Sequence, residues 1–70
     1  MTLRELLDVL THEEKVALAE KAETTYIYLF QMAAGARSPS PKLARKLAAA
    51  DSRLKLADLR PDIWGRQTTH

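Results

Sequence analysis

Residues that could carry out catalysis are scarce in this chain of 70 residues and are not grouped. There is no cysteine, so disulfides, zinc ribbons and thiol nucleophiles are excluded together. His12 and His70 lie near opposite ends of the chain and predict no metal site. Glu13 and Glu14 are adjacent, and adjacent side chains on a helix point roughly 100° apart, so they form no catalytic pair. With only two glycines, no glycine-rich loop could hold a nucleotide. We therefore expect no enzyme, no cofactor, no metal and no small-molecule substrate.

The segment 25–34 has side chains that could instead bind a partner. A helical projection of this segment gives one free side, made of Ile27, Phe30, Gln31 and Ala34, with Tyr26 and Tyr28 on its flanks. In a first interpretation, Ile27 and Phe30 contact thymine methyl groups and Gln31 pairs with adenine. Thr25 and Tyr26 then reach bases or phosphates. In a second interpretation, these side chains are core or dimer surface, because a bulky apolar stripe more often packs than recognises.

Basic residues gather in the second half of the chain, behind this segment. Residues 1–35 carry three basic against six acidic side chains, a net charge of −3, whereas residues 36–70 carry eight against three, a net charge of +5. This asymmetry favours a polyanionic partner on one side. We expect Arg37, Ser38 and Lys42 to contact phosphates, Lys42 beside the free backbone N–H groups of a helix start. For Arg45 and Lys46, plain solvent exposure is an equally good explanation.

Helices must position these side chains, and the sequence marks the first two. Leucines at positions 3, 6, 7 and 10 have helical spacing, and Thr2 can cap the start of that helix. Thr11 and Glu14 have the spacing of a capping box, which predicts a second helix over about 12–22.

Further capping signals predict the remaining helices. Thr24 or Thr25 caps a third helix, which Gly35 ends in a left-handed turn. Ser40 caps a fourth helix, with a proline at its first position. A short fifth helix is expected over 56–59, where Pro61 stops it, and residues 62–65 form a compact apolar anchor.

The second and third helices are separated by only two or three residues, which is the layout of a helix-turn-helix. The small Ala19 suits a close crossing, and Leu29 and Met32 supply a buried side for the third helix. We predict an all-α fold, a compact bundle of four to five short helices containing this helix-turn-helix. Residues 1–64 form one domain and residues 65–70 a flexible C-terminal tail.

No apolar run approaches the ~18 residues that span a bilayer, and the N-terminus lacks the layout of a signal peptide, so we expect a cytoplasmic protein.

The helix-turn-helix segment also carries a pattern of residues in a fixed order. It has Leu18-Ala19 on the second helix, Leu29 and Met32 as buried aliphatic residues of the third, then Gly35 and the basic loop Arg37-Ser38-Pro39-Ser40. This pattern resembles the helix-turn-helix of Cro/CI-type phage repressors. The resemblance is closest to the YdaS-like, Cro-like branch, because a Tyr-Leu-x-Gln run lies at 28–31 and Leu-Arg-Pro-Asp-Ile-Trp at 59–64. The match covers roughly residues 3–64.

The resemblance implies a lambda-repressor-like DNA-binding domain and a phage or prophage regulator. Such a protein binds a double-stranded operator as a homodimer and inserts the helix at about 25–34 into the major groove. Two residues depart from the family pattern. Glu23 replaces the usual turn glycine, so the turn must accept a side chain or hold mild strain. Phe30 stands where relatives often have a basic residue, which bears on the operator preference.

The dimer contacts are expected at the C-terminal end, through Leu59, Ile63 and Trp64. Trp64 has an equally good alternative, which is to cover the core of its own chain. Two other functions stay open. The scaffold could be a protein-interaction module, antitoxin-like, which binds a partner through the aromatic face of the third helix. It could also package DNA without sequence preference.

Overall fold

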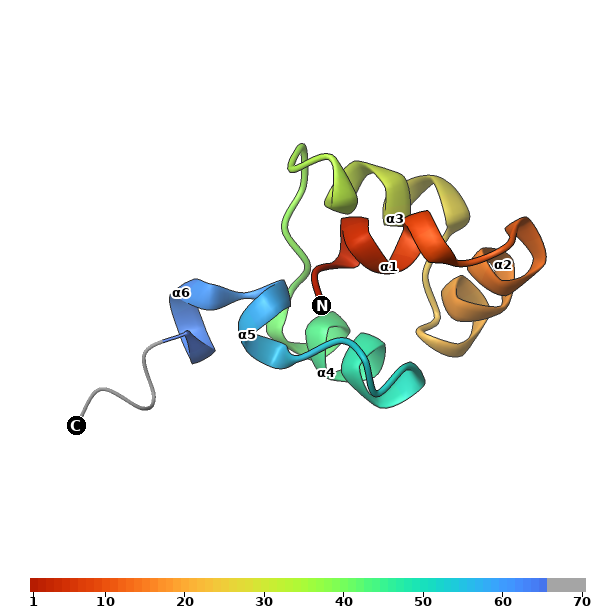
Figure 1. Ribbon diagram of the computed structural model, residues 1–70. Coiled ribbons are helices and arrows are strands. Elements are labelled where there is room, and N and C mark those ends of the chain that lie inside the picture. Colours follow the sequence, from red (N-terminus) through yellow and green to blue (C-terminus); the bar gives the residue numbers. More distant parts are fainter. Residues whose placement is uncertain (66–70) are drawn as a thin grey trace.

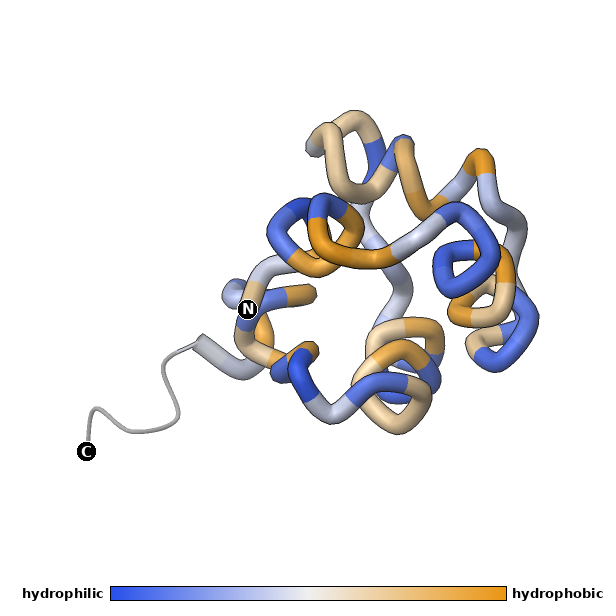
Figure 2. The backbone as a smooth tube through the Cα atoms, turned by 45° about the vertical axis from the view of Figure 1, so that its right-hand side comes forward, coloured by the Kyte–Doolittle hydropathy of each residue, from blue (hydrophilic) through white to orange (hydrophobic). Residues whose placement is uncertain are grey.

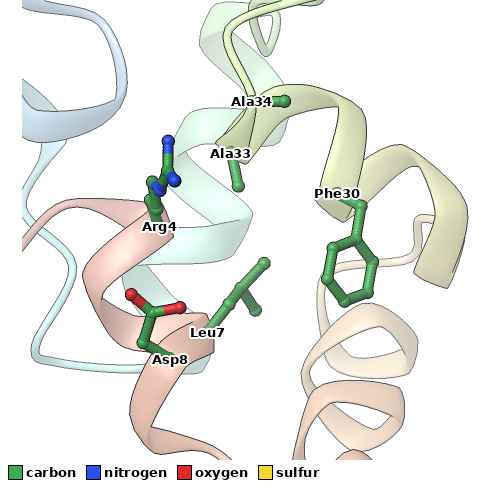
Figure 3. Close-up of a pocket in the computed structure, with 6 residues that line it drawn as sticks. All are labelled: Arg4, Leu7, Asp8, Phe30, Ala33 and Ala34. Carbon is green, nitrogen blue, oxygen red and sulfur yellow. The ribbon is translucent and has the colours of Figure 1, made fainter.

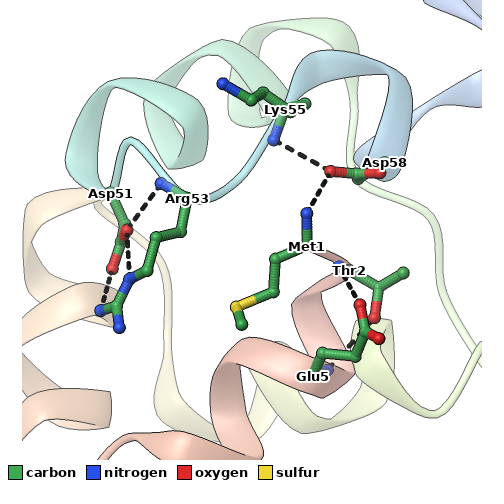
Figure 4. A network of polar contacts seen from close by, with 7 residues as sticks. All are labelled: Met1, Thr2, Glu5, Asp51, Arg53, Lys55 and Asp58. Carbon is green, nitrogen blue, oxygen red and sulfur yellow. Dashed lines mark hydrogen bonds and ion pairs between the residues drawn. The ribbon is translucent and has the colours of Figure 1, made fainter.

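Hydroxyl side chains set where the first four helices begin. In the computed structural model, which describes residues 1–65, Thr2, Thr11, Thr25 and Ser40 each accept a hydrogen bond from a free backbone N–H of the first turn. At Thr2 and Thr11 a glutamate three residues later closes the capping box (Figure 4 for Thr2). The helices are α1 (Leu3–Val9), α2 (His12–Lys21), α3 (Tyr26–Ala33), α4 (Pro41–Ala50), α5 (Leu56–Leu59) and α6 (Pro61–Trp64).

The fold is all-α and compact, as predicted, with no strand in residues 1–65. α3 packs on α1 and on α2, α2 packs also on α4, and α5 connects α4 to α6 (Figure 1). The core is built almost entirely of leucine and alanine: Leu3, Leu6, Leu7, Leu18, Ala19, Ala22, Leu29, Met32, Ala44, Leu47, Leu54 and Leu59. Hydrophobic stretches of α1 and α4 turn toward this interior (Figure 2). The alanines have small side chains, which lets α2 lie close to both α3 and α4.

The predicted number of helices, four to five, was too low, because the segment after α5 is also helical. Pro61 occupies the first turn of α6 with Arg60 as its N-cap, so the proline begins a helix as well as following one. A proline fits this position because its missing N–H has no partner there. Gly65 donates its N–H to the Pro61 carbonyl at 2.9 Å and so closes the last turn. Residues 66–70, the rest of the predicted tail, lie outside the described residues.

Two successive helices end in the same way. After α2, the N–H of Thr24 donates to the Ala19 carbonyl at 2.9 Å, and the residue between helix and turn, Glu23, has φ +59°. After α3, the N–H of Ala36 donates to the Gln31 carbonyl at 2.9 Å, and Gly35 has φ +83°. Both are Schellman motifs, in which a left-handed residue satisfies the last carbonyls of the helix. Glycine adopts this conformation freely and a glutamate does not.

Arg60 fastens the loop between α3 and α4 to the C-terminal helices. Its guanidinium donates one hydrogen bond to the Pro39 carbonyl at 2.8 Å and two to Asp62 at 2.9 and 2.6 Å. The end of α4 is fixed by Asp51, which accepts from the backbone and the guanidinium of Arg53 (Figure 4). The Arg60 bonds thus hold the chain just before α4, and the Asp51 bonds hold it just after α4.

None of the helices in residues 1–65 combines the length and the apolar character that a membrane span requires.

Candidate nucleic-acid interface

The outer ridge of α3 is made of Ile27, Gln31 and Ala34, the last of which also lines a groove between α1 and α3. All three are exposed, and 69% of Ile27 is accessible to solvent. On the opposite side of the same helix, Leu29 and Met32 are buried in the core. An exposed β-branched residue beside an exposed glutamine gives this ridge one apolar and one hydrogen-bonding contact point. The amide of Gln31 can both donate and accept.

Thr25 begins the ridge, and its hydroxyl already has a structural task. The oxygen accepts a hydrogen bond from the Tyr28 N–H at 3.1 Å and so caps α3. A threonine hydroxyl has one proton to donate besides. Thr25 is exposed, so that proton can reach an acceptor outside the chain.

Tyr26 and Phe30 lie on the flank of α3 that faces the start of α2. Their rings meet edge to face at 4.8 Å between centroids. The Tyr26 hydroxyl lies 3.1 Å from Nδ1 of His12, and the Lys15 ammonium lies 5.4 Å above the Phe30 ring. An ammonium over an aromatic face is attracted to it. We call Tyr26, Phe30, His12 and Lys15 the aromatic flank.

Phe30, which the helical projection placed on the free side with Ile27 and Gln31, thus has neighbours from α2 as well. It remains 40% exposed and lines a groove of about 240 Å³ between α1 and α3 (Figure 3). Sequence reasoning missed His12 and Lys15 as neighbours of α3, although their i, i+3 spacing places both on one side of α2. Tyr28, on the other flank, is half-buried against the core.

The expected phosphate contacts lie in and after the loop that leaves α3. Arg37 and Ser38 are exposed in that loop, and Lys42 is exposed in the first turn of α4. Arg37 and Lys42 form no ion pair with any residue in the range 1–65. Both charges can therefore meet an anion from solution, although Lys42 also acts electrostatically on the nearby Glu23 carboxylate.

Arg45 and Lys46, whose role the sequence did not decide, each contact another side chain of the fold. The Arg45 guanidinium lies 5.7 Å from the Trp64 ring centre, a cation–π contact between α4 and α6. The Lys46 ammonium forms an ion pair with Glu23, the left-handed residue of the α2–α3 turn. The hydrogen bond and charge of Lys46, with a smaller contribution from Lys42, lower the pKa of Glu23 below its usual value.

At the C-terminal end, the three expected dimer contacts differ in how far they are exposed. Leu59 is only 8% exposed and belongs to the core of its own chain, so its side chain is not at the surface. Ile63 is 44% exposed, and Trp64 is half-buried against the core. Trp64 thus contributes to the core of its own chain and still presents part of its ring.

No protein-family model, no curated protein and no solved structure matches this chain. Within residues 1–65, no group of three or more His, Cys, Asp or Glu side chains is placed to hold a metal ion. The ridge, the aromatic flank and the basic residues beside them are the features of this surface that could bind a partner.

Proposed function

We propose that this chain is a sequence-specific DNA-binding transcription regulator of the Cro-like, YdaS-like repressor type. The observation that carries the proposal is the outer ridge of α3, which follows a short turn and is flanked by uncommitted basic residues. The major groove of B-DNA is about 12 Å wide and admits one α-helix. A regulator of this kind acts in the cytoplasm of a bacterial host.

In the proposed complex, the ridge reads bases and the following loop binds the backbone. Gln31 pairs with an adenine, Ile27 contacts a thymine methyl group, and Thr25 donates its hydroxyl proton. Arg37 and Lys42 neutralise phosphates. Tyr26 and Phe30 contact the edge of the groove through the exposed parts of their rings.

The second candidate is a protein-interaction module that uses the same face of α3. The exposure of Ile27, together with the apolar groove beside Phe30, favours it, because a small soluble domain rarely leaves such side chains uncovered without a use. Salt separates the two candidates. Binding to DNA weakens with a log–log slope of about −0.9 for each phosphate neutralised, whereas an apolar protein interface hardly responds.

A homodimer fits the proposed function because helix-turn-helix proteins often bind two half-sites through two copies. Ile63 and the exposed part of Trp64 are the surface we propose for it. Sedimentation over a range of protein concentrations, with Ile63→Ser as the comparison, tests this. A chain that stays monomeric at all concentrations and on DNA would contradict the dimer and leave the groove contact standing.

The decisive experiment is selection of bound sequences from a random duplex pool at physiological salt. We expect one motif to be enriched, with an A·T pair at the position that Gln31 reads. Binding without enrichment would mean packaging without sequence preference. Absence of binding at any salt concentration would favour the protein-interaction module.

A further inference from the structure

The turn between α2 and α3 and the start of α4 share one groove of about 220 Å³. Its lining includes Glu23 and Thr24 from the turn and Ser40, Lys42 and Lys46 from the fourth helix and its cap. Lys42 and Lys46 are one helical turn apart, so both ammonium groups lie on the same side of α4. Thr24 directly precedes Thr25, the first residue of the proposed interface. The groove thus adjoins the place where a DNA strand engaging the start of α3 would pass.

The acidic group in this groove is the Glu23 carboxylate, and it is bound to Lys46. The pair is exposed, with 35% of the Lys46 and 69% of the Glu23 side chain accessible. Exposed ion pairs contribute little to stability and are easily exchanged for another partner. Glu23 also holds a left-handed backbone conformation that glycine would adopt without strain. Neither the backbone nor the fold's stability therefore explains a glutamate here.

We propose that the Glu23 carboxylate acts as an internal competitor of a DNA phosphate for Lys46. Both groups offer oxygen acceptors of negative charge to an ammonium donor. In the free chain Lys46 is occupied, and the neighbouring Lys42 feels a negative charge that opposes an approaching phosphate. Lys46 is then a latent phosphate contact, and Glu23 limits the affinity for DNA. This inference rests on the proposed function.

The test compares Glu23→Gln with the unchanged full chain on a duplex from the selection experiment. Fluorescence anisotropy over about 50 to 200 mM salt gives the affinity and its salt slope. We expect Glu23→Gln to bind about threefold to tenfold more tightly at the low-salt end and to steepen the slope by about 0.9, the change for one more phosphate. Glu20→Gln is the matched control: it changes the net charge equally at an exposed position of α2 that is not in the groove.

A second background makes the result specific to Lys46. In a chain carrying Lys46→Met, the gain in DNA affinity from Glu23→Gln should shrink to the gain that Glu20→Gln gives.

Should Glu23→Gln fail to fold, Glu23→Gly removes the same carboxylate and relieves the backbone. An unchanged affinity for both Glu23 variants, in a chain that does bind DNA, overturns the inference alone. If neither the unchanged chain nor any variant binds DNA, the proposed function fails with it. Equal gains with and without Lys46 also overturn the inference.

Discussion

At the scale of single residues, the outer ridge of α3 exposes one large apolar side chain and one side chain that can form hydrogen bonds. Ile27 is the most exposed of the large apolar side chains in residues 1–65, and Gln31 lies one turn further along the same side. Their spacing of four residues places them side by side on the helix, so in the proposed complex both would reach one short run of base pairs. The aromatic flank meets them from the side of α2 rather than from the ridge itself.

We predict that Gln31→Ala lowers the discrimination between operator sequences. A bidentate pair with adenine contributes about 1–3 kcal/mol of discrimination against the wrong base. Competition binding with the selected motif and with single-base variants measures this loss at the affected position. A loss of the same size on every sequence would contradict base reading by Gln31.

Lys42→Ala should instead weaken binding to all sequences equally. Lys42 has no ion-pair partner in residues 1–65, so the variant removes a free charge without breaking a contact of the fold. The salt slope should become shallower by about 0.9, the value for one lost phosphate contact. Lys55→Ala is the control, because Lys55 is an exposed residue that follows α4 in the sequence and lies outside the proposed interface. Unchanged affinity of Lys42→Ala at low salt would refute the assignment.

At the scale of elements, the α2 and α3 ends show one motif with two different residues at its left-handed position. A Cβ at Gly35 would meet no atom within 4 Å, so any cost of a side chain there is conformational and not steric. Gly35 and Glu23 can therefore be compared as two versions of one helix end.

We predict that Gly35→Ala and Glu23→Gly shift stability in opposite directions. Gly35→Ala should lower the melting temperature by roughly 4–8 °C, because a left-handed alanine costs about 1 kcal/mol in a domain of this size. Glu23→Gly should raise it and should give a higher melting temperature than Glu23→Ala, because both variants lose the ion pair but only glycine relieves the backbone. Thermal unfolding followed by circular dichroism measures all three. A Glu23→Gly variant less stable than Glu23→Ala would show that the turn holds no strain.

The helix starts were predictable because their signals are local. Thr2, Thr11, Ser40 and the pair of candidates at 24 and 25 identified four starts correctly, since a hydroxyl caps the N–H groups of its own first turn. The end of α5 before Pro61 was predicted correctly, but the helix that Pro61 begins was not, because a proline is compatible both with the residues after one helix and with the first turn of the next.

The site was less predictable than the helices because its details depend on how helices cross. In a helix as short as α3, Phe30 lies between the buried and the free side, and only the position of α1 and α2 decides its environment. The pairing of Glu23 with Lys46 joins residues 23 positions apart and follows from the packing of α2 on α4. Sequence spacing carries no signal for such a contact.

At the scale of the whole molecule, the charged contacts lie at the surface and the core is free of them. No polar or charged residue in the described part of the chain is buried. Hydrogen bonds from Arg53, Arg60 and the Thr2 backbone lower the pKa of Asp51, Asp62 and Glu5 respectively. In each case the partner stabilises the charged form of the carboxyl group.

We predict that stability is constant from neutral pH to about pH 5 and falls below about pH 4. A carboxyl group with a lowered pKa in the folded state contributes stability above its unfolded pKa. That contribution is lost as the pH falls through the folded pKa, because the unfolded chain binds more protons in this range. Urea unfolding at a series of pH values measures the slope. Asp51→Asn should flatten the fall, whereas Asp8→Asn, an exposed aspartate without an ion pair in residues 1–65, should not. Equal slopes for both variants would contradict the role of Asp51.

The hydrogen bond from Arg60 to the Pro39 carbonyl has a consequence for grafting α2 and α3 onto another protein scaffold. The loop that follows α3 is held by Arg60, which comes after α5, so the segment of α2 and α3 alone lacks the residue that fixes this loop. A graft of 12–42 onto another scaffold would leave that loop untethered. A transplant that also carries 54–64 should keep Arg37 and Ser38 in register with the helix before them.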